Sequence, residues 1–112
     1  MIESYSFGKI VIDGKQYGTD VIIFPDHVKD GWRRKDGHML RVEDLEDVLQ
    51  AKPEVLVVGT GYFGSMKVPS EVREYLASMK IQLIAENTRE AYKTLNQLAL
   101  TKKTVAAFHL TC

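Results

Sequence analysis

The feature that most constrains the fold is an alternation of short apolar runs with helical periodicity in the second half of the chain. The runs EVLVVG, IQLIAE and TVAAFHL cover residues 54–59, 81–86 and 104–110. Each run follows a stretch in which apolar residues recur at the spacing of an amphipathic helix. Three such pairs of helix and strand predict a largely parallel sheet, with right-handed crossovers and with helices packed on it.

The first quarter of the chain has a β pattern instead. The segments KIVI and KQY flank Asp13-Gly14, a pair typical of type I′ hairpins because both central residues need a positive φ. A strand over DVIIF ends at Pro25, and the loop PDHVKDGWRRKDGH follows it. A chain of 112 residues has room for one core, so we predict a single α/β domain spanning residues 1–112.

Glycines follow the first of the three apolar runs in the pattern G-x-G-x-x-G, at Gly59, Gly61 and Gly64. After a strand, this pattern is typical of dinucleotide-binding folds, in which the next helix begins at the glycines. Pro69 would then lie about two turns inside the helix, where proline costs about 3 kcal/mol or more. We therefore expect the helix to begin at Pro69-Ser70 and the glycines to form a loop, and we predict no cofactor.

The carboxyl ends of the three predicted parallel strands meet at one edge of the sheet, where open α/β folds usually bind ligands. We predict a candidate ligand-binding cleft at this edge, in which the backbone amides of residues 59–61 receive an anionic group. Its residues are Gly59, Thr60, Gly61, Tyr62, Asn87, Thr88 and Arg89. A simpler interpretation of Asn87 is that it caps a helix whose first turn is solvated.

A tryptophan and several cations lie together in the segment GWRRKDGH, which contains Trp32, Arg33 and Arg34. One hypothesis is a surface contact, in which the ring stacks on a partner and the cations meet phosphates. The interpretation that we favour is a surface loop that Trp32 anchors to the body of the domain, with its cations balanced by neighbouring aspartates.

No grouping of residues in the sequence points to catalysis or to a metal. His27 and His38 lack the spacing of metal ligands. Cys112 follows His109 by three positions, so the two side chains would point to opposite faces of a strand. We therefore predict no catalytic residue and no metal site. Three further residues are expected to pack in the core: Tyr75, Met79 and Tyr92.

Charge and composition argue against some classes of partner. Fifteen basic and fifteen acidic residues cancel, so no overall field attracts nucleic acid or an acidic membrane, and we expect neither as a partner. The N-terminal segment MIESYSFGKIV has no apolar stretch typical of a signal peptide. No run approaches the ~20 apolar residues of a membrane span. The lone cysteine, Cys112, favours a reducing compartment, and we expect the cytoplasm.

The order of several motifs is similar to that of a known family. These motifs are GW with a following arginine, PEVLVVGTG, KVPSEVREYL, NTREAYKTLNQL and the ending VAAFHLTC. Over nearly its whole length the chain resembles the small adipogenesis-associated Mth-domain family. The resemblance implies a three-layer α/β fold with a mixed central sheet and an extra small β element. It carries over no catalytic residue, because none is established for the family.

The resemblance also shapes the functional hypotheses. Eukaryotic members include a protein linked to adipocyte differentiation and a mitochondrial factor that helps to assemble respiratory complex I, whereas the short prokaryotic members are uncharacterised. Our leading hypothesis is a non-catalytic protein-interaction or assembly module. The alternative is a protein that binds a small anion or nucleotide in the cleft around Gly59–Gly61 and Asn87–Thr88. An enzyme with a site built from the same loops is a third hypothesis.

Overall fold

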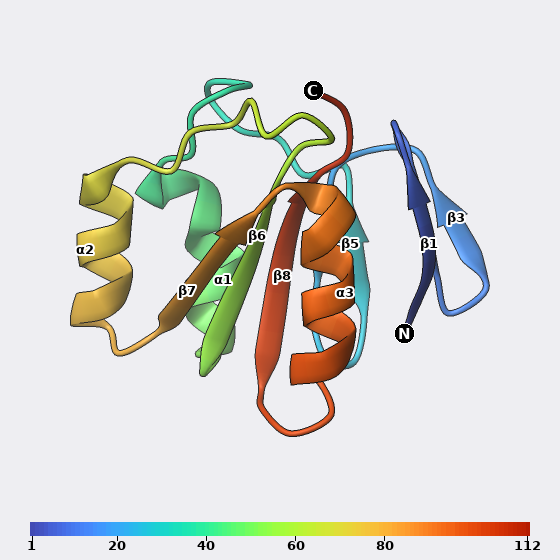
Figure 1. Ribbon diagram of the computed structural model, residues 1–112. Helices are drawn as coiled ribbons and strands as arrows, with labels where there is room; N and C mark the ends of the chain where they lie inside the picture. Colours follow the sequence, from blue (N-terminus) through green and yellow to red (C-terminus); the bar gives the residue numbers. More distant parts are fainter.

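The computed structural model describes residues 1–112, and its strands form two separate sheets (Figure 1). The small antiparallel sheet has the strand order β1-β2-β3, and the large sheet has the order β5-β4-β8-β6-β7. The strands are β1 (Ile2–Ser6), β2 (Lys9–Ile12), β3 (Lys15–Tyr17), β4 (Val21–Ile23), β5 (Val28–Asp30), β6 (Val55–Thr60), β7 (Gln82–Glu86) and β8 (Thr104–His109). Strand β6 is parallel to β7 and β8, whereas β4 is antiparallel to β5 and β8, so the large sheet is mixed.

Helices cover both faces of the large sheet. They are α1 (Glu46–Ala51), α2 (Ser70–Ser78) and α3 (Thr88–Leu98), and a 3-10 turn, η1 (Val42–Leu45), leads into α1. Helices α1 and α2 share one core cluster with Leu56 and Val58 of β6. Helix α3 and the small sheet share the other cluster with Val55 and Val57. Figure 1 accordingly shows α3 in front of the sheet and α1 behind it, which confirms the three-layer α/β fold.

The local signals in the sequence correspond to real elements. All six residues of β6 are buried, as expected for a strand covered on both faces. Asp13 and Gly14 have φ values of 49° and 80°, so the Asp-Gly pair forms the turn of the β2–β3 hairpin with positive φ at both positions. Helix α2 begins at Ser70 with Pro69 as its N-cap residue, so the glycines do lie in a loop before it.

Three details differ from the expectations. Residues 28–30, expected in a loop, form β5 because they pair with β4. The first helical stretch is split into η1 and α1. Tyr75 and Met79, expected in the core, are 40% and 51% exposed, because α2 directs Val72 and Leu76 into the core instead. None of the three α-helices is long and apolar enough to cross a membrane.

Candidate functional site

The ends of the parallel strands meet as the sequence predicts. Gly59 of β6 lies between Glu86 of β7 and Phe108 of β8, and Thr60 lies beside His109. The predicted site residues on β6 and at the start of α3 are thereby brought together. Thr60 Oγ1 donates a hydrogen bond to the Glu86 carbonyl oxygen at 3.1 Å. The carboxyl ends of β6, β7 and β8 therefore form one edge of the sheet, as predicted. The hydrogen bonds at this edge determine which groups are free to bind a ligand.

Thr88 joins the three strand ends through its side chain. Its fully buried hydroxyl accepts from the Gly61 amide at 2.9 Å and donates to the His109 carbonyl oxygen at 2.7 Å. Its own amide donates to the Gly61 carbonyl oxygen at 3.0 Å. A Cβ on Gly59 would lie 2.7 Å from the Thr88 hydroxyl oxygen, so this glycine is required for packing rather than for a phosphate.

The amides of the glycine loop are occupied by the protein itself. The Tyr62 amide donates to the Thr111 carbonyl oxygen at 2.7 Å, and the Ser65 amide donates to the Cys112 oxygen at 3.1 Å. The Gly64 amide donates to the carbonyl oxygen of Gly61 at 3.2 Å. Gly61 has a φ of 106° and lies directly against the segment of residues 111–112. The expectation that the Gly61 amide would receive an anion is therefore corrected, because that amide donates to the Thr88 hydroxyl and the segment after β8 accepts from the amides of Tyr62 and Ser65.

Asn87 caps α3, in agreement with its simpler interpretation. Its side-chain oxygen accepts a hydrogen bond from the Glu90 amide at 3.2 Å. Arg89, two residues later, is exposed and forms no salt bridge; its guanidinium carbon lies 4.7 Å from the centre of the Tyr62 ring. Of the predicted site residues, Tyr62 and Arg89 thus share a contact at the surface, whereas Thr88 is buried.

A cluster of aromatic rings surrounds Tyr62. Its ring centre lies 5.9 Å from that of Phe7, 5.0 Å from that of Phe63 and 6.3 Å from that of Tyr5. Tyr92 of α3 lies 6.2 Å from Tyr5. Phe63 is 70% exposed and Phe7 is 51% exposed, although both rings are large and apolar. We use the name aromatic edge for the exposed Phe7, Phe63 and Arg89 together with the half-buried Tyr62 that they contact.

Sequence reasoning did not find the two phenylalanines. A signal for them is present, because each is followed directly by a glycine, Gly8 or Gly64, with a φ of 77° or 72°. Glycine at a positive φ is typical of a tight turn, and turns lie at the surface, so a residue directly before such a glycine is placed near solvent. The two turns come from distant parts of the chain, and only the fold brings them together.

A buried charged cluster lies behind this edge. The Asp20 carboxylate accepts from Arg34 Nη1 and from His109 Nδ1, both at 2.9 Å, and from the Leu110 amide at 2.8 Å. Burial opposes ionisation of Asp20, but the hydrogen bonds from His109, Leu110 and Arg34 outweigh it and hold its pKa below the usual range. The cluster joins the start of β4, the loop of residues 31–38 and the end of β8.

The same cluster corrects the hypothesis of a surface contact at residues 32–34. Trp32 is 7% exposed, and the Arg34 side chain is 4% exposed. The indole nitrogen of Trp32 donates to the Asp44 carbonyl oxygen at 3.0 Å, and Arg34 lies over the indole ring at 4.6 Å. Trp32 is therefore an anchor, and of the three residues only Arg33 is exposed.

An open pocket of about 540 Å³ lies next to Thr60 on the α2 side of the edge. Its lining includes the cations Lys67 and Arg73, neither of which forms a salt bridge. Arg73 donates instead to the Val68 carbonyl oxygen at 3.1 Å. This pocket borders the glycine loop, because Gly64 of that loop is one of its lining residues.

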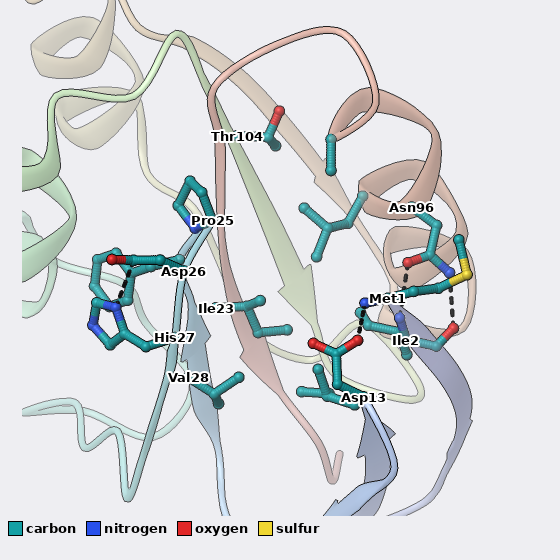
Figure 2. A pocket seen from close by; sticks show the side chains of 14 residues that line it. Met1, Ile2, Asp13, Ile23, Pro25, Asp26, His27, Val28, Asn96 and Thr104 are labelled. Carbon is teal, nitrogen blue, oxygen red and sulfur yellow. Dashed lines mark hydrogen bonds and ion pairs between the residues drawn. The ribbon is translucent and has the colours of Figure 1, made fainter.

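A second cavity, of about 180 Å³, lies between the small sheet, the β4–β5 turn and α3 (Figure 2). Its walls are both apolar and polar, and the polar side chains around it already have partners. Asn96 bonds both the amide and the carbonyl oxygen of Ile2, and the Asp13 carboxylate meets the Met1 nitrogen. The Asp26 carboxylate accepts a hydrogen bond from the His27 ring, and this contact holds the pKa of Asp26 below its ordinary value. The cavity therefore presents few free polar groups to a ligand.

The residues around the sheet edge bring together aromatic rings, a cation and occupied backbone amides. No group of three His, Cys, Asp or Glu side chains is placed to hold a metal ion. Large rings exposed beside a cation are chemically suited to contact another molecule. The molecule is thus a small three-layer α/β domain with an exposed aromatic edge.

Comparison with known proteins assigns the chain to a family. It belongs to the family described as protein of unknown function (DUF498/DUF598), whose model matches residues 2–110. It is similar to a conserved hypothetical protein from Pyrococcus horikoshii, with 31% identity and a TM-score of 0.85 over 100% of this chain and 99% of the other. The protein called MT938 has 27% identity and a TM-score of 0.82, over 100% and 98% of the two chains.

The fold recurs in a Mth938-like domain from Bordetella pertussis. That domain has 23% identity and a TM-score of 0.68, over 97% of this chain and 84% of the other. The family resemblance and the fold class inferred from the motifs are therefore confirmed. None of these descriptions names an activity.

Proposed function

We propose that this domain is a non-catalytic protein-interaction or assembly module that holds a partner protein against the aromatic edge. The observation that carries the proposal is the exposure of Phe63 and Phe7, at 70% and 51%, in one contiguous cluster. Exposed apolar clusters commonly mark interaction sites, and aromatic residues with arginine dominate the binding energy of protein interfaces. The assembly-factor relative named by the family resemblance is consistent with this role.

The edge is also held in shape before any partner arrives. The loop that carries Tyr62 and Phe63 is fixed by the hydrogen bonds of Tyr62, Gly64 and Ser65 described above. A surface that is already ordered loses less conformational entropy on binding, which favours affinity. The occupied amides that close the anion cradle therefore support a protein-binding edge.

The test is affinity capture with a matched pair of variants. The double variant Phe7→Ser/Phe63→Ser removes the two exposed rings, and Leu100→Ser is the control because Leu100 is 78% exposed outside the cluster. We expect a partner that crosslinks to the wild-type chain and to the control but is lost with the double variant. Partners recovered equally by all three proteins would refute the aromatic edge as the binding surface.

A second candidate function is the binding of a small anion or nucleotide in the pocket beside Thr60. The observation that favours it is the pair of cations Lys67 and Arg73, which line the pocket without a carboxylate partner. In an NMR titration with inorganic phosphate and with nucleotides, we expect shifts at residues 64–70. The shifts should disappear in Lys67→Gln/Arg73→Gln, and an unmoved spectrum of the wild-type chain would remove this candidate.

We further propose the cytoplasm as the site of action. The single cysteine, Cys112, has no second thiol in the chain with which to form a disulfide, which suits a reducing compartment. Fractionation of cells that express the tagged chain tests this proposal. Recovery in a membrane or secreted fraction would contradict it.

A further inference from the structure

We propose that the partner presents a carboxylate beside an apolar side chain, and that Arg89 receives this carboxylate while Phe7 and Phe63 contact the apolar group. The inference rests on the proposed function and names the chemistry of its partner.

Arg89 is a cation without a counter-charge. It is exposed and forms no salt bridge, and its guanidinium is placed by the Tyr62 ring, 4.7 Å away. Stacking on a ring restrains the guanidinium while its N–H groups stay free to donate, and their fork matches a carboxylate. An arginine held in this way is prepared to receive one.

The ionisable residues next to the aromatic edge in the chain include one free cation, and the two carboxylates nearest Arg89 in the chain have other partners. Lys9, next to the Phe7-Gly8 turn, is exposed and forms no salt bridge. Glu90 pairs with Lys93 at 3.6 Å, and the Glu86 carboxylate accepts from the Thr94 hydroxyl at 2.6 Å. The aromatic edge thus combines exposed rings with a guanidinium that pairs with no carboxylate of the chain. Charge complementarity therefore favours an acidic partner.

The geometry of the rings favours a polypeptide over single-stranded nucleic acid. Bases need open ring faces on which to stack. Here the planes of Phe7 and Phe63 are inclined at 65° and 73° to that of Tyr62, and Arg89 covers a face of Tyr62. Rings inclined in this way present edges as well as faces, against which an aliphatic or aromatic side chain packs.

The small number of cations at the aromatic edge favours a polypeptide partner over a lipid surface. A cation near an anionic membrane contributes about 1 kcal/mol, so stable anchoring by charge needs a cluster of several. The aromatic edge contains one cation, Arg89, and Lys9 follows Phe7 by two positions in the chain. A contact with one carboxylate of a polypeptide needs only one cation, and Arg89 supplies it.

The experiment selects short random peptides on the immobilised full chain and measures the affinity of a selected peptide. We expect enrichment of Asp or Glu close to Leu, Phe or Trp. Arg89→Gln should weaken binding about tenfold, or about 1.4 kcal/mol, because the carboxylate loses its partner. Replacing the peptide's acid with its amide should cause a similar loss in the wild-type chain and little further loss in Arg89→Gln. The control is Lys102→Gln, which alters an exposed cation that forms no salt bridge and lies just before β8, at the end of that strand away from the aromatic edge.

The possible outcomes separate the inference from the proposed function. Peptides that depend on Phe7 and Phe63 but not on Arg89 overturn the inference and leave the aromatic edge as a binding surface. Peptides indifferent to all three residues overturn both. Selection without acidic residues, or no selection at all, overturns the inference, and the capture experiment then decides the proposed function. Binding only to phosphatidylserine vesicles or to oligothymidine also overturns it, in favour of a lipid or a nucleic acid.

Discussion

Replacing Gly59 with alanine tests the conclusion that the glycine-rich segment serves packing. The added Cβ would lie 2.7 Å from the Thr88 hydroxyl oxygen and 2.8 Å from Cδ1 of Phe108. Both neighbours are fully buried. The Thr88 oxygen is held by hydrogen bonds to the Gly61 amide and to the His109 carbonyl oxygen, so it cannot move away without loss.

The expected loss of stability follows from these contacts. Overpacking a buried site costs about 1–3 kcal/mol. A displaced Thr88 hydroxyl would leave buried backbone groups without partners, at a further cost of about 1–3 kcal/mol. Alanine restricts the unfolded chain more than glycine, which returns about 0.4–1 kcal/mol. We therefore expect Gly59→Ala to lower the free energy of unfolding by about 3 kcal/mol, a large part of the stability of a typical domain.

Urea denaturation followed by circular dichroism measures this loss. Gly37→Ala is the matched control, because a Cβ there meets no atom within 4 Å, and its free energy of unfolding should change by less than about 0.5 kcal/mol. Thr88→Ala should be destabilising alone, yet the double variant should lose less than the two single losses together, because the shortened side chain relieves the clash. A loss below about 1 kcal/mol in Gly59→Ala, or strict additivity, would refute the packing argument.

Three further predictions concern the residues around the edge. Asp20→Asn should cost about 3 kcal/mol at neutral pH, measured by urea denaturation, because it leaves Arg34 and His109 buried without their anion. The native Asp20 pKa is lowered, so its stabilisation is present above the unfolded value of 3.8 and is lost as the pH falls below it; the variant's deficit should shrink in that range. Asn87→Ala should lower the melting temperature through a loss of about 1 kcal/mol in helix capping, and an unchanged melting temperature would contradict the cap. Burial raises the Tyr5 pKa to about 12, so Tyr5→Phe should remove a phenolate transition near that pH from the ultraviolet titration.

Much of the fold was predictable because its signals are local. The continuous apolar run of residues 55–58 predicted a strand buried on both faces, and β6 is one. Pro69 predicted where α2 begins, because proline is unfavourable inside a helix but acceptable at its start. Asn87 predicted the first turn of α3 by capping it. The convergence of strand ends at one edge followed from the parallel order of these elements.

The predictions that failed depend on contacts between distant segments. Helical spacing placed Tyr75 and Met79 near the core stripe of α2, but the position of the helix on the sheet exposed them. Arg34 appeared as a surface cation, and its burial is explained only by Asp20 and by His109, which lies 75 residues away in the chain. Residues 28–30 form a strand because β4 is placed to pair with them.

The sequence by itself determined the order of the elements, their turns and caps, and the place where the strand ends meet. These depend on backbone preferences and on apolar periodicity within a few residues. The tertiary structure decided which groups at that edge are free. In the folded chain the amides of Tyr62 and Ser65 donate hydrogen bonds to the oxygens of Thr111 and Cys112, and Phe7 lies against Phe63 at the surface. The sequence around a hydrogen-bond donor or an aromatic ring does not indicate which distant residue it will contact. Only the packed chain therefore shows that this edge presents rings and a cation instead of free amides for a phosphate.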